Sequence, residues 1–596
     1  FLPIVFVPGI TGLLFKDMAL VVVFALLCSL FVAMTLIPLM CSRFLKVGDR
    51  NRFFKALARW QRRLEEGYRN SLEWALNHRK TVILIVAVAF FGTLLMVYPF
   101  RLIGTEFIPE TDEGRLQFSI KLPVGTRLEE TIKTVSRMEE KIKGICGKDL
   151  EAILTTVGTG EGIAAMFRGG AGEHAATIVV RLTDPDQRKR SQKEIETQVF
   201  DAISKIPGVD VKAEISSPYM SAFGAAPIVI EIYGHDRRKA MEIADQIKGV
   251  LKSVRGLYNV HVDVDKPLPE YHVLIDRGEA AARGMSAAMI ANTIQSYVQG
   301  TVATRYREGG DEYDVLVRLK KEDRSSRNAL NSLLVPTPTG KLIPLSSVAK
   351  IERTYGPITI DRKKQERYIS VTAGLRGRDL GSAMREIMMK IASLKRQGKL
   401  ETPGDFSIEF GGSAKEQRES FRWLGIAFIG AIFLVYAVMA AQFESLLDPF
   451  IIMFTVPLAV IGVIWMLALT GTTLSILSFS GAIMLAGIVV NNGIVMVDYI
   501  NLLRREYGMG LMEAVIEGGR RRMRPVLMTA LTTIFGMIPM AIGLGSGAEL
   551  RAPLARAVVG GLTVSTFLTL FFVPVVYSIF ERISARLKGG KSSEQA

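Results

Sequence analysis

Cysteine and histidine are scarce in this sequence. Its three cysteines, Cys28, Cys41 and Cys146, are scattered, and the first two lie within apolar stretches. They indicate neither a disulfide framework nor a metal site. The five histidines lack the spacing of metal ligands, so we expect neither a resident metal nor another cofactor. The sequence has no P-loop motif, so we do not expect ATP to be an energy source.

Apolar residues, in contrast, are abundant. They make up 49% of the chain, and the mean hydropathy is positive, which is unusual for a water-soluble protein and indicates membrane spans. Charged residues still make up 22%, so a large part of the chain must face water. The net charge of +16 could indicate nucleic-acid binding, but in a membrane protein the position of charge matters more than its total. We therefore expect an integral membrane protein that is not an enzyme and has no nucleic-acid partner.

Apolar stretches near the roughly 20 residues needed to cross a bilayer recur along the chain. They predict about seven complete spans and one that is cut short. These stretches lie at residues 1–15 (cut short), 18–41, 81–100, 423–442, 449–470, 476–502, 525–543 and 554–579. The polar region between the third and fourth complete spans is far too long for a connecting loop, so it must be a folded domain outside the membrane.

The start of the chain is similar to its end. The sequence begins at Phe1 inside an apolar run, without a signal peptide. The spacing from Pro8 to Pro38 is close to that from Pro539 to Pro574, and both pairs enclose a glycine-containing loop and a span. Parallel repeats of this kind are typical of duplicated transporters. We therefore expect this chain to be the C-terminal fragment of a longer protein.

Basic residues gather on one side of the predicted membrane. Residues 43–80 hold roughly eleven Lys and Arg against about four acidic residues, residues 503–524 hold about six Arg, and the tail after Glu581 is basic. Counting spans alternately places these segments in the cytoplasm and the large domain in the periplasm. In the first segment, apolar residues from Phe54 to Ala75 recur at helical spacing beside arginines, which predicts an amphipathic helix on the inner membrane surface.

The polar domain alternates short strands with amphipathic helices. Residues 116–122 have the period of two of a strand and precede a helical pattern, and similar pairs begin near 175 and 227. This order predicts small α/β sandwiches of split βαβ topology. Residues 265 to about 350 contain glycine and proline turns instead, and are predicted to form an insertion into the second sandwich.

Polar residues interrupt one apolar span. Asn491, Asn492 and Asp498 lie there, although an ionised Asp at the centre of a span costs about 2.5–3.5 kcal/mol, so they must face protein or water. The next span supplies Arg522 at its cytoplasmic edge and Thr529 deeper. One interpretation is a polar node in an ion pathway. The alternatives are helix packing for the asparagines, an interfacial charge for Asp498, a topology signal for Arg522 and a bond to its own backbone for Thr529.

The chain closely resembles the resistance-nodulation-division transporters, and among them the hydrophobe/amphiphile efflux branch typified by the AcrB-type inner-membrane pump. The resemblance rests on several motifs in the family's order: GTEFIPETDEGRLQFSIKLPVGT, GIVVNNGIVMVDYI, RRRMRPVLMT and FFVPVVYSIF. It implies a homotrimer in the bacterial inner membrane that works with a periplasmic adaptor protein and an outer-membrane channel. Such a pump would export amphiphilic small molecules, such as drugs, dyes and detergents, in exchange for protons.

The implied fold is a polytopic α-helical membrane protein. Its large periplasmic α/β domain would contain ferredoxin-like porter subdomains of split βαβ topology plus a docking insertion. The predicted domains are the end of a first transmembrane half (1–43), a cytoplasmic linker with a surface helix (44–80), a span (81–100), one porter subdomain (101–215), a second porter subdomain (216–264 and 352–422), a docking subdomain (265–351), a five-span bundle (423–579) and a basic cytoplasmic tail (580–596).

The resemblance also implies two functional sites. A mobile switch loop would lie near GTGEGIAAMFRGGAGEH, with Met166 and Phe167 as substrate contacts, although an ordinary surface loop is the alternative. A proton relay would include Asn492, Arg522 and Thr529, which keep the family's residue types. Asn491, however, stands where the family has a lysine, and the family's paired aspartates would lie upstream. Either Arg522 or water then replaces the lysine, or the coupling ion differs.

Two other functions stay open. The heavy-metal branch of the same family would use methionine clusters for Cu(I) or Ag(I), but Met166 and Met220 form no recognisable triad. A nontransporting polytopic protein, such as a lipid or sterol sensor or an export accessory, would share the spans. The complete set of two porters and a docking region argues against the export accessory.

Overall fold

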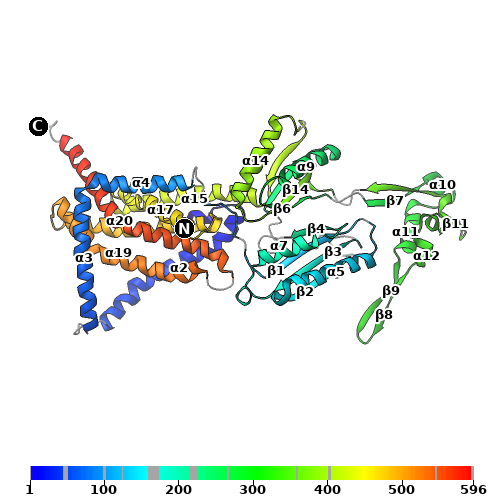
Figure 1. Ribbon diagram of the computed structural model, residues 1–596, viewed down its shortest axis with the longest axis horizontal. Coiled ribbons are helices and arrows are strands. Elements are labelled where there is room, and N and C mark those ends of the chain that lie inside the picture. Colours follow the sequence, from blue (N-terminus) through cyan, green and yellow to red (C-terminus); the bar gives the residue numbers. More distant parts are fainter. Residues whose placement is uncertain are drawn as a thin grey trace. The chain divides into compact units, whose positions relative to one another are not determined.

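A computed structural model describes residues 2–44, 52–97, 103–109, 111–123, 125–158, 173–214, 226–264, 268–356, 360–400, 404–543 and 547–591. The chain divides into two compact units, Phe1–Asp263 with Lys363–Ala596, and Val264–Arg362. The first unit contains the long helices and two α/β sandwiches, and the second is inserted between two strands of the later sandwich (Figure 1).

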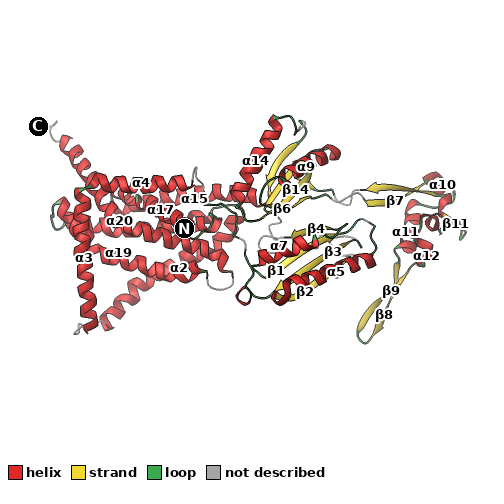
Figure 2. Ribbon diagram, viewed as in Figure 1, coloured by secondary structure: helices red, strands yellow, loops and turns green. Residues whose placement is uncertain are grey.

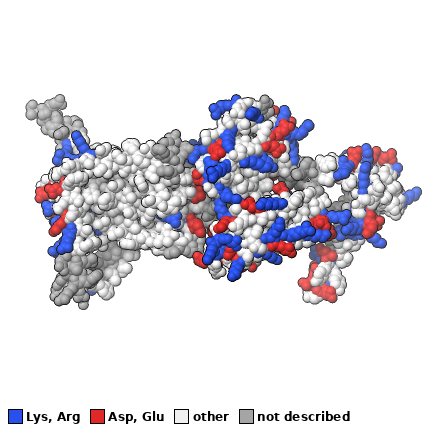
Figure 3. Space-filling view, in the orientation of Figure 1, with Lys and Arg blue, Asp and Glu red and all other residues white. Residues whose placement is uncertain are grey.

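Among the described residues, seven helical segments are long and apolar enough to cross a membrane. This number agrees with the complete spans predicted from the sequence. They are α2 (Gly9–Phe44), α4 (Arg79–Val97), α15 (Gly412–Phe443), the pair α16 (Leu447–Met453) and α17 (Thr455–Leu469) as one span, α18 (Ile476–Arg505), α19 (Leu511–Ile542) and α20 (Ala548–Lys591) (Figure 2). The visible surface over these helices is almost free of charged side chains, as a lipid environment requires (Figure 3).

Helices α2, α15, α19 and α20 extend well beyond the predicted stretches. The cut-short span at 1–15 does not form, because only α1 (Leu2–Val5) precedes a break at Pro8, and α2 then runs unbroken. Pro8 has no N–H to donate and Gly9 has φ of 76°, so the helix ends there and a new one starts. Helix α15 begins directly after a strand, so 412–422 are helical, and α20 continues into the predicted tail.

Helices α17 and α20 cross at glycines. A Cβ atom added to Gly462 would lie 2.3 Å from the carbonyl oxygen of Gly560 and 2.8 Å from the Cα of Gly561. Lipid tails are as apolar as leucine, so helices in a membrane gain little from burial alone and instead pack closely through small residues. The glycines therefore fix how near these two helices can come.

We expect Gly462→Ala to destabilise the bundle by about 1–3 kcal/mol, the usual cost of overpacking. The added methyl group would collide with the α20 backbone, which cannot move aside as a flexible side chain can. The thermal midpoint of the detergent-solubilised protein should fall. Gly425→Ala in α15 is the matched control, since a Cβ there meets no atom within 4 Å. Equal midpoints for the two variants would contradict the packing argument.

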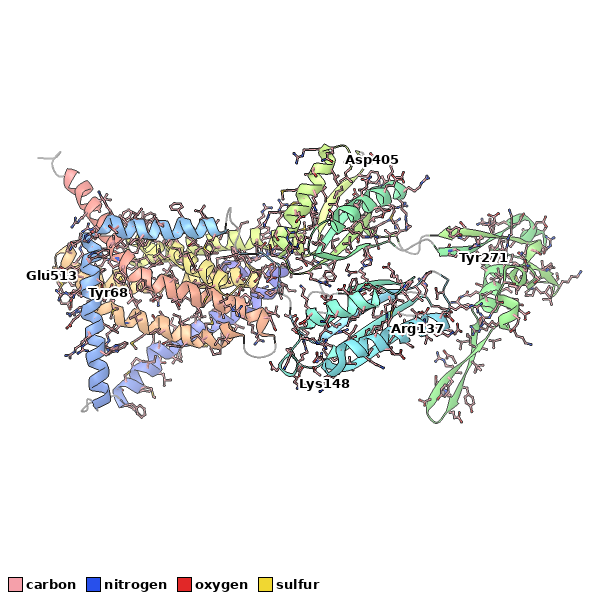
Figure 4. All side chains as sticks on the ribbon, viewed as in Figure 1. Tyr68, Arg137, Lys148, Tyr271, Asp405 and Glu513 are labelled. Atoms are coloured by element: carbon pink, nitrogen blue, oxygen red, sulfur yellow. The ribbon has the colours of Figure 1, made fainter. Side chains whose placement is uncertain are left out.

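Helix α3 (Arg52–Asn77) lies across one end of the long helices. Tyr68, Leu72 and Leu76 are buried against α19 and α20, and the Tyr68 hydroxyl donates to the carbonyl oxygen of Leu570 at 2.6 Å (Figure 4). Trp60 and Trp74 are exposed. The predicted membrane-surface helix is thus also packed against the bundle, through Tyr68, Leu72, Ala75 and Leu76. We call this end of the bundle, which carries Arg504, Arg505 and Arg520–Arg522, the basic end.

The first sandwich contains a four-stranded antiparallel sheet. Helices α5 (Leu128–Cys146) and α7 (Gln192–Ile203) pack on one face, and the alternate strand residues Leu116, Phe118 and Ile120 are fully buried there. The strand order is β2 (Leu150–Val157), β3 (Ala175–Leu182), β1 (Arg115–Lys121) and β4 (Asp210–Glu214). The period of two in the sequence thus separates a core face from a polar face.

The second sandwich is built in the same way around a five-stranded sheet. Apolar residues of its central strand, such as Ile230 and Ile232, pack against helices α9 (Arg237–Lys252) and α14 (Leu380–Arg396). The strand order in this sheet is β13 (Arg362–Lys363), β14 (Glu366–Leu375), β5 (Ile228–Tyr233) and β15 (Ser407–Gly411). Strand β6 (Leu257–Val262) also pairs with β14. The chain leaves this sandwich after β6 and returns at β13.

A buried ion pair lies on the other face of this sheet. Glu231, 6% exposed, accepts hydrogen bonds from Lys363 Nζ at 2.7 and 3.0 Å and from the Tyr233 hydroxyl at 2.6 Å. Burial disfavours the charged form of Glu231, but the hydrogen bonds from Lys363 and Tyr233 outweigh it and hold its pKa below the ordinary value. Gly411 gives the carboxylate room, since a Cβ there would lie 2.7 Å from Oε1.

The inserted unit has its own small core, which includes Ile290, Val335, Leu345 and Ile351. Its paired strands are β7 (Leu268–Ile275) with β12 (Ala349–Gly356), β8 (Thr301–Glu308) with β9 (Asp311–Val317), and β10 (Leu334–Pro336) with β11 (Leu342–Pro344); its helices are α10 (Arg277–Ala282), α11 (Ala287–Val298), α12 (Lys321–Arg324) and α13 (Arg327–Asn331). The assignment of this unit as a docking subdomain, and of the sandwiches as porter subdomains, stays a prediction.

Candidate functional site

Helix α18 carries the polar residues and is packed on more than one side. At its start, Ser475 and Ser478 cap each other's backbone N–H groups, which fixes where the helix begins. A Cβ on Gly481 would lie 2.8 Å from the carbonyl oxygen of Leu554, and one on Gly493 would lie 2.9 Å from Ile452 Cγ2. These close approaches hold α18 between α20 and α16, and they fix the direction in which each polar side chain points.

Asn492 lies between three helices. Asn492 of α18 is 4% exposed. Its Oδ1 accepts a hydrogen bond from Thr529 Oγ1 of α19 at 3.3 Å, and its Nδ2 donates a hydrogen bond to Thr566 Oγ1 of α20 at 3.4 Å. The Thr529 hydroxyl also lies 3.0 Å from the carbonyl oxygen of Val526. Because a hydroxyl has one proton, it can serve only one of these acceptors at a time. Thr529 can therefore switch between its own backbone and Asn492.

Arg522 and Tyr499 form a second contact between the same helices. The guanidinium carbon of Arg522 lies 4.4 Å from the centre of the Tyr499 ring, a cation–π geometry, and Arg521 Nη1 donates to the Tyr499 hydroxyl at 3.1 Å. Both residues lie seven positions, or about 10 Å, from the Asn492–Thr529 pair towards the basic end. We call Asn492, Thr529, Thr566, Tyr499 and Arg522 the polar ladder.

One donor in the polar ladder is unused. The Nε of Arg522 is buried and has no hydrogen-bond partner among the described residues. Leaving a buried donor unsatisfied costs about 1–3 kcal/mol, and more for a charged group. Arg522 Nε can therefore donate to a carboxylate or a water molecule at little additional cost.

Asn491 and Asp498 point away from the polar ladder. Both are exposed on the surface of the described bundle. They are seven residues apart and so lie on one side of α18, about two turns from each other. The two adjacent asparagines therefore have different surroundings: Asn492 is held by protein, whereas Asn491 and Asp498 form an open polar edge.

The structure places two of the five residues predicted for the relay, Asn492 and Thr529, in contact, and it places Arg522 about two helical turns from them on the same helix as Thr529. Asn492, Arg522 and Thr529 belong to the polar ladder, and Asn491 and Asp498 do not. Sequence reasoning did not include Thr566 and Tyr499. The run Ser565, Thr566 and Thr569 within an apolar span was the available signal for Thr566.

The predicted substrate contacts Met166 and Phe167 lie outside the described residues, as does Met220. Within the described ranges, no group of three or more His, Cys, Asp or Glu side chains could hold a metal ion.

Comparison with known proteins places the chain in a family. The model described as the AcrB/AcrD/AcrF family matches residues 1–581. The cobalt-zinc-cadmium resistance protein CzcA of Cupriavidus metallidurans is 31% identical, over 98% of this chain and 54% of its own length. The swarming motility protein SwrC of Bacillus subtilis is 29% identical, over 99% of this chain and 54% of its own length.

A solved structure agrees with these relatives. The crystal structure of a heavy metal efflux pump has a TM-score of 0.79 and 28% sequence identity, covering 98% of this chain and 56% of that one. The chain spans about half the length of the curated relatives it matches. Since the family model matches nearly all of it, the chain belongs to the AcrB/AcrD/AcrF family of resistance-nodulation-division permeases.

Proposed function

We propose that this chain forms part of a proton-driven efflux pump and that the polar ladder is one side of its coupling site. The observation that carries the proposal is the buried Asn492, hydrogen-bonded to Thr529 and Thr566 within membrane-spanning helices. Family members are secondary transporters, in which an ion gradient supplies the energy. Polar groups at this depth are costly and therefore mark candidate functional sites, and a hydroxyl that can change acceptors is suited to following the charge of a neighbouring group.

The exposed side chains of Asn491 and Asp498 indicate that the coupling site has a second side, formed by another part of the whole protein. A polar edge facing lipid would be unfavourable, so in the whole protein it needs a protein or water partner. The relatives are nearly twice as long as this chain, which covers 54% of CzcA. We propose that the whole protein contains a further segment, equivalent to the additional length of the relatives. This segment would face the open polar edge and supply the proton-carrying acids. Arg522, with its unused Nε, would then be the cation that replaces the family's lysine.

The energy released by proton entry is sufficient to drive substrate export against a concentration gradient. One charge that crosses a potential of 100 mV releases about 2.3 kcal/mol. A hundredfold substrate gradient costs about 2.7 kcal/mol, at 1.4 kcal/mol per tenfold. One or two protons per substrate therefore meet the requirement.

The proposed setting follows the family. Its permeases are multi-pass inner-membrane proteins with a large periplasmic domain, and they act as trimers with an adaptor and an outer-membrane channel. We propose the same location and partners for the whole protein. The cluster of arginines at the basic end supports an orientation with that end in the cytoplasm.

We propose divalent heavy-metal cations as the substrate class. The amphiphiles expected from the sequence resemblance are less well supported, because CzcA is named for cobalt, zinc and cadmium resistance and the solved structure is of a heavy metal efflux pump. The sequence-based alternative named copper and silver, which prefer methionine and cysteine. Cobalt, zinc and cadmium also bind imidazole and carboxylate, so a methionine triad is not required.

Two observations keep amphiphile efflux as the second candidate. No group of three metal-binding side chains occurs among the described residues, so the described part of the outer domain shows no binding site for a cation. SwrC, at 29% identity, is named for swarming motility rather than for a metal. The choice between the two candidates therefore needs a direct measurement.

We expect the whole protein, reconstituted in vesicles, to transport zinc, cobalt or cadmium when a pH gradient is imposed. An internal fluorescent metal indicator would follow the cation, and a fluorescent amphiphile would be tested in parallel vesicles. Protein-free vesicles under the same gradient are the control. Transport of the amphiphile without the cation would reverse the substrate assignment, and movement driven by a sodium gradient but not by protons would contradict the coupling ion.

A further inference from the structure

A second polar chain runs through the basic end, separate from the polar ladder. Asn501 lies nine residues after Asn492 on α18, about 14 Å further along the helix. Its Nδ2 donates to Asp448 Oδ2 of α16 at 3.1 Å, and its Oδ1 accepts from the Tyr577 hydroxyl of α20 at 2.6 Å. The Tyr577 hydroxyl in turn accepts from Arg504 Nη1 at 2.8 Å. The chain therefore joins three membrane-spanning helices.

The hydrogen bonds of this chain all point in one direction. Arg504 donates to Tyr577, Tyr577 donates to Asn501, and Asn501 donates to Asp448. The chain thus begins at a cation and ends at a carboxylate, and each donor orients the next. Arg504 also pairs with Glu581 at 2.7 Å, where both side chains are partly exposed. One end of the chain is therefore in contact with solvent and the other is not.

Asp448 is the buried end. It is 4% exposed, and it forms no ion pair with any residue that the structure describes. Its direct side-chain partner is the neutral Asn501, while Arg504 and Arg505 of α18 and Glu581 of α20 act on it only from a distance. A structural link between α16 and α18 could be made by Asn or Thr without the desolvation cost of a buried carboxylate. We therefore expect the charge of Asp448 to have a function beyond linking the two helices.

We propose that Asp448 is a proton-binding residue of the pump at the basic end, and that Asn501, Tyr577 and Arg504 position it. This inference rests on the proposed proton coupling. In one state the Asp448 carboxylate accepts from Asn501. In the other it has bound one proton, its charge changes from −1 to 0, and the donor chain from Arg504 loses its anionic end. Asp448 takes up this proton from the side of the proposed coupling site and releases it to water at the basic end when α16 loosens from α18 and α20, which restores the carboxylate.

Protonation of Asp448 would also change how three helices are held together. The Asn501 amide donates more strongly to a carboxylate than to a neutral acid, because charge-assisted hydrogen bonds are roughly twice as strong. Proton binding therefore loosens α16 from α18 and α20, and proton release tightens them again.

The test uses the whole protein in vesicles with a pH gradient and zinc as the transported probe. Asp448→Asn is expected to lower transport against a zinc gradient at least tenfold, while zinc movement down its gradient remains. Tyr577→Phe keeps the ring and removes the hydroxyl, so it should move the pH of half-maximal transport towards alkaline values, because Asn501 is then not held as a donor to the carboxylate. Asp448→Glu should restore part of the activity. Glu513→Gln is the control, because Glu513 is exposed at the same end of the bundle (Figure 4).

An infrared difference spectrum supplies a readout that a purely structural role would not change. The wild-type protein should show a carboxylic-acid band that appears as the pH falls, is absent from Asp448→Asn and is displaced in Tyr577→Phe. If wild-type transport does not depend on protons, the proposed function fails. If wild-type transport does depend on protons but Asp448→Asn and Tyr577→Phe keep its pH profile and the band, Asp448 is not the proton-binding residue. Should Asp448→Asn fail to fold, the profile and band of Tyr577→Phe decide the question.

Discussion

Thr529→Val is expected to reduce proton-driven transport by at least about a hundredfold, equivalent to about 2.7 kcal/mol at 1.36 kcal/mol per tenfold. Valine has nearly the same shape as threonine but cannot donate to Asn492, which then loses its contact with α19. Asn492→Leu should cause a similar loss because it removes the contacts with both Thr529 and Thr566. The measurement is the initial rate of zinc transport in vesicles under an imposed pH gradient, normalised to reconstituted protein.

Thr563→Val provides the matched control. The Thr563 hydroxyl donates to the carbonyl oxygen of Val559 in its own helix at 2.7 Å, so its loss should leave the interhelical contacts unchanged. All variants should assemble as the wild type does by size-exclusion chromatography. Transport at the wild-type rate in both Thr529→Val and Asn492→Leu would reduce the polar ladder to a packing contact and remove the main support for the proposed function.

The spans could be predicted from the sequence because they depend on one property. A stretch of about 20 apolar residues is stable in lipid whatever its neighbours are. The ends of the helices could not be predicted as well, since α15 begins inside a polar segment at Gly412 and α20 extends to Lys591. Backbone hydrogen bonding continues a helix into water wherever no residue stops it, so hydropathy alone does not mark the boundary.

The candidate site could be predicted only in part. The rarity of polar residues within spans is enough to single out Asn491, Asn492 and Thr529. Which asparagine contacts protein depends on rotation, because adjacent residues on a helix point about 100° apart. The rotation of α18 is fixed by contacts far along the chain, such as Gly481 with Leu554 and Gly493 with Ile452. A single sequence shows the glycines but not their partners.

The buried charges could not be predicted at all. Glu231 interrupts an apolar strand and resembles an ordinary solvent-facing residue, and its partner Lys363 is 132 positions away. Asp448 and Asn501 are likewise joined only by the fold, 53 positions apart. Such pairs form when strands or helices that are distant in the chain lie next to each other, so only the structure could reveal them.

Lys363→Met is expected to destabilise the second sandwich by about 2–3 kcal/mol at neutral pH. Removal of one partner from a fully buried pair costs about 3–5 kcal/mol, and the effect is smaller here because 40% of the Lys363 side chain is exposed. The Glu231 carboxylate would stay buried with the Tyr233 hydroxyl as its remaining partner. Hydrogen exchange of peptides from β5 and β14, measured on the whole protein, should show correspondingly lower protection factors. Lys350→Met in β12 is the matched control, since its pair with Glu352 is exposed to solvent and its loss should change the protection factors little.

The loss of stability in Lys363→Met should also depend on pH. Because Lys363 helps to hold the pKa of Glu231 below its ordinary value, the ion pair stabilises the fold fully above the ordinary carboxyl range, and this contribution is lost as the pH falls through the lowered pKa. In the variant, Glu231 lacks the cation and can take up a proton instead, which relieves the cost of burying its charge. The difference in protection between wild type and Lys363→Met should therefore be largest near neutral pH and shrink on acidification. A difference that stayed constant across this range would mean that Lys363 stabilises the sheet through the packing of its aliphatic chain rather than through its charge.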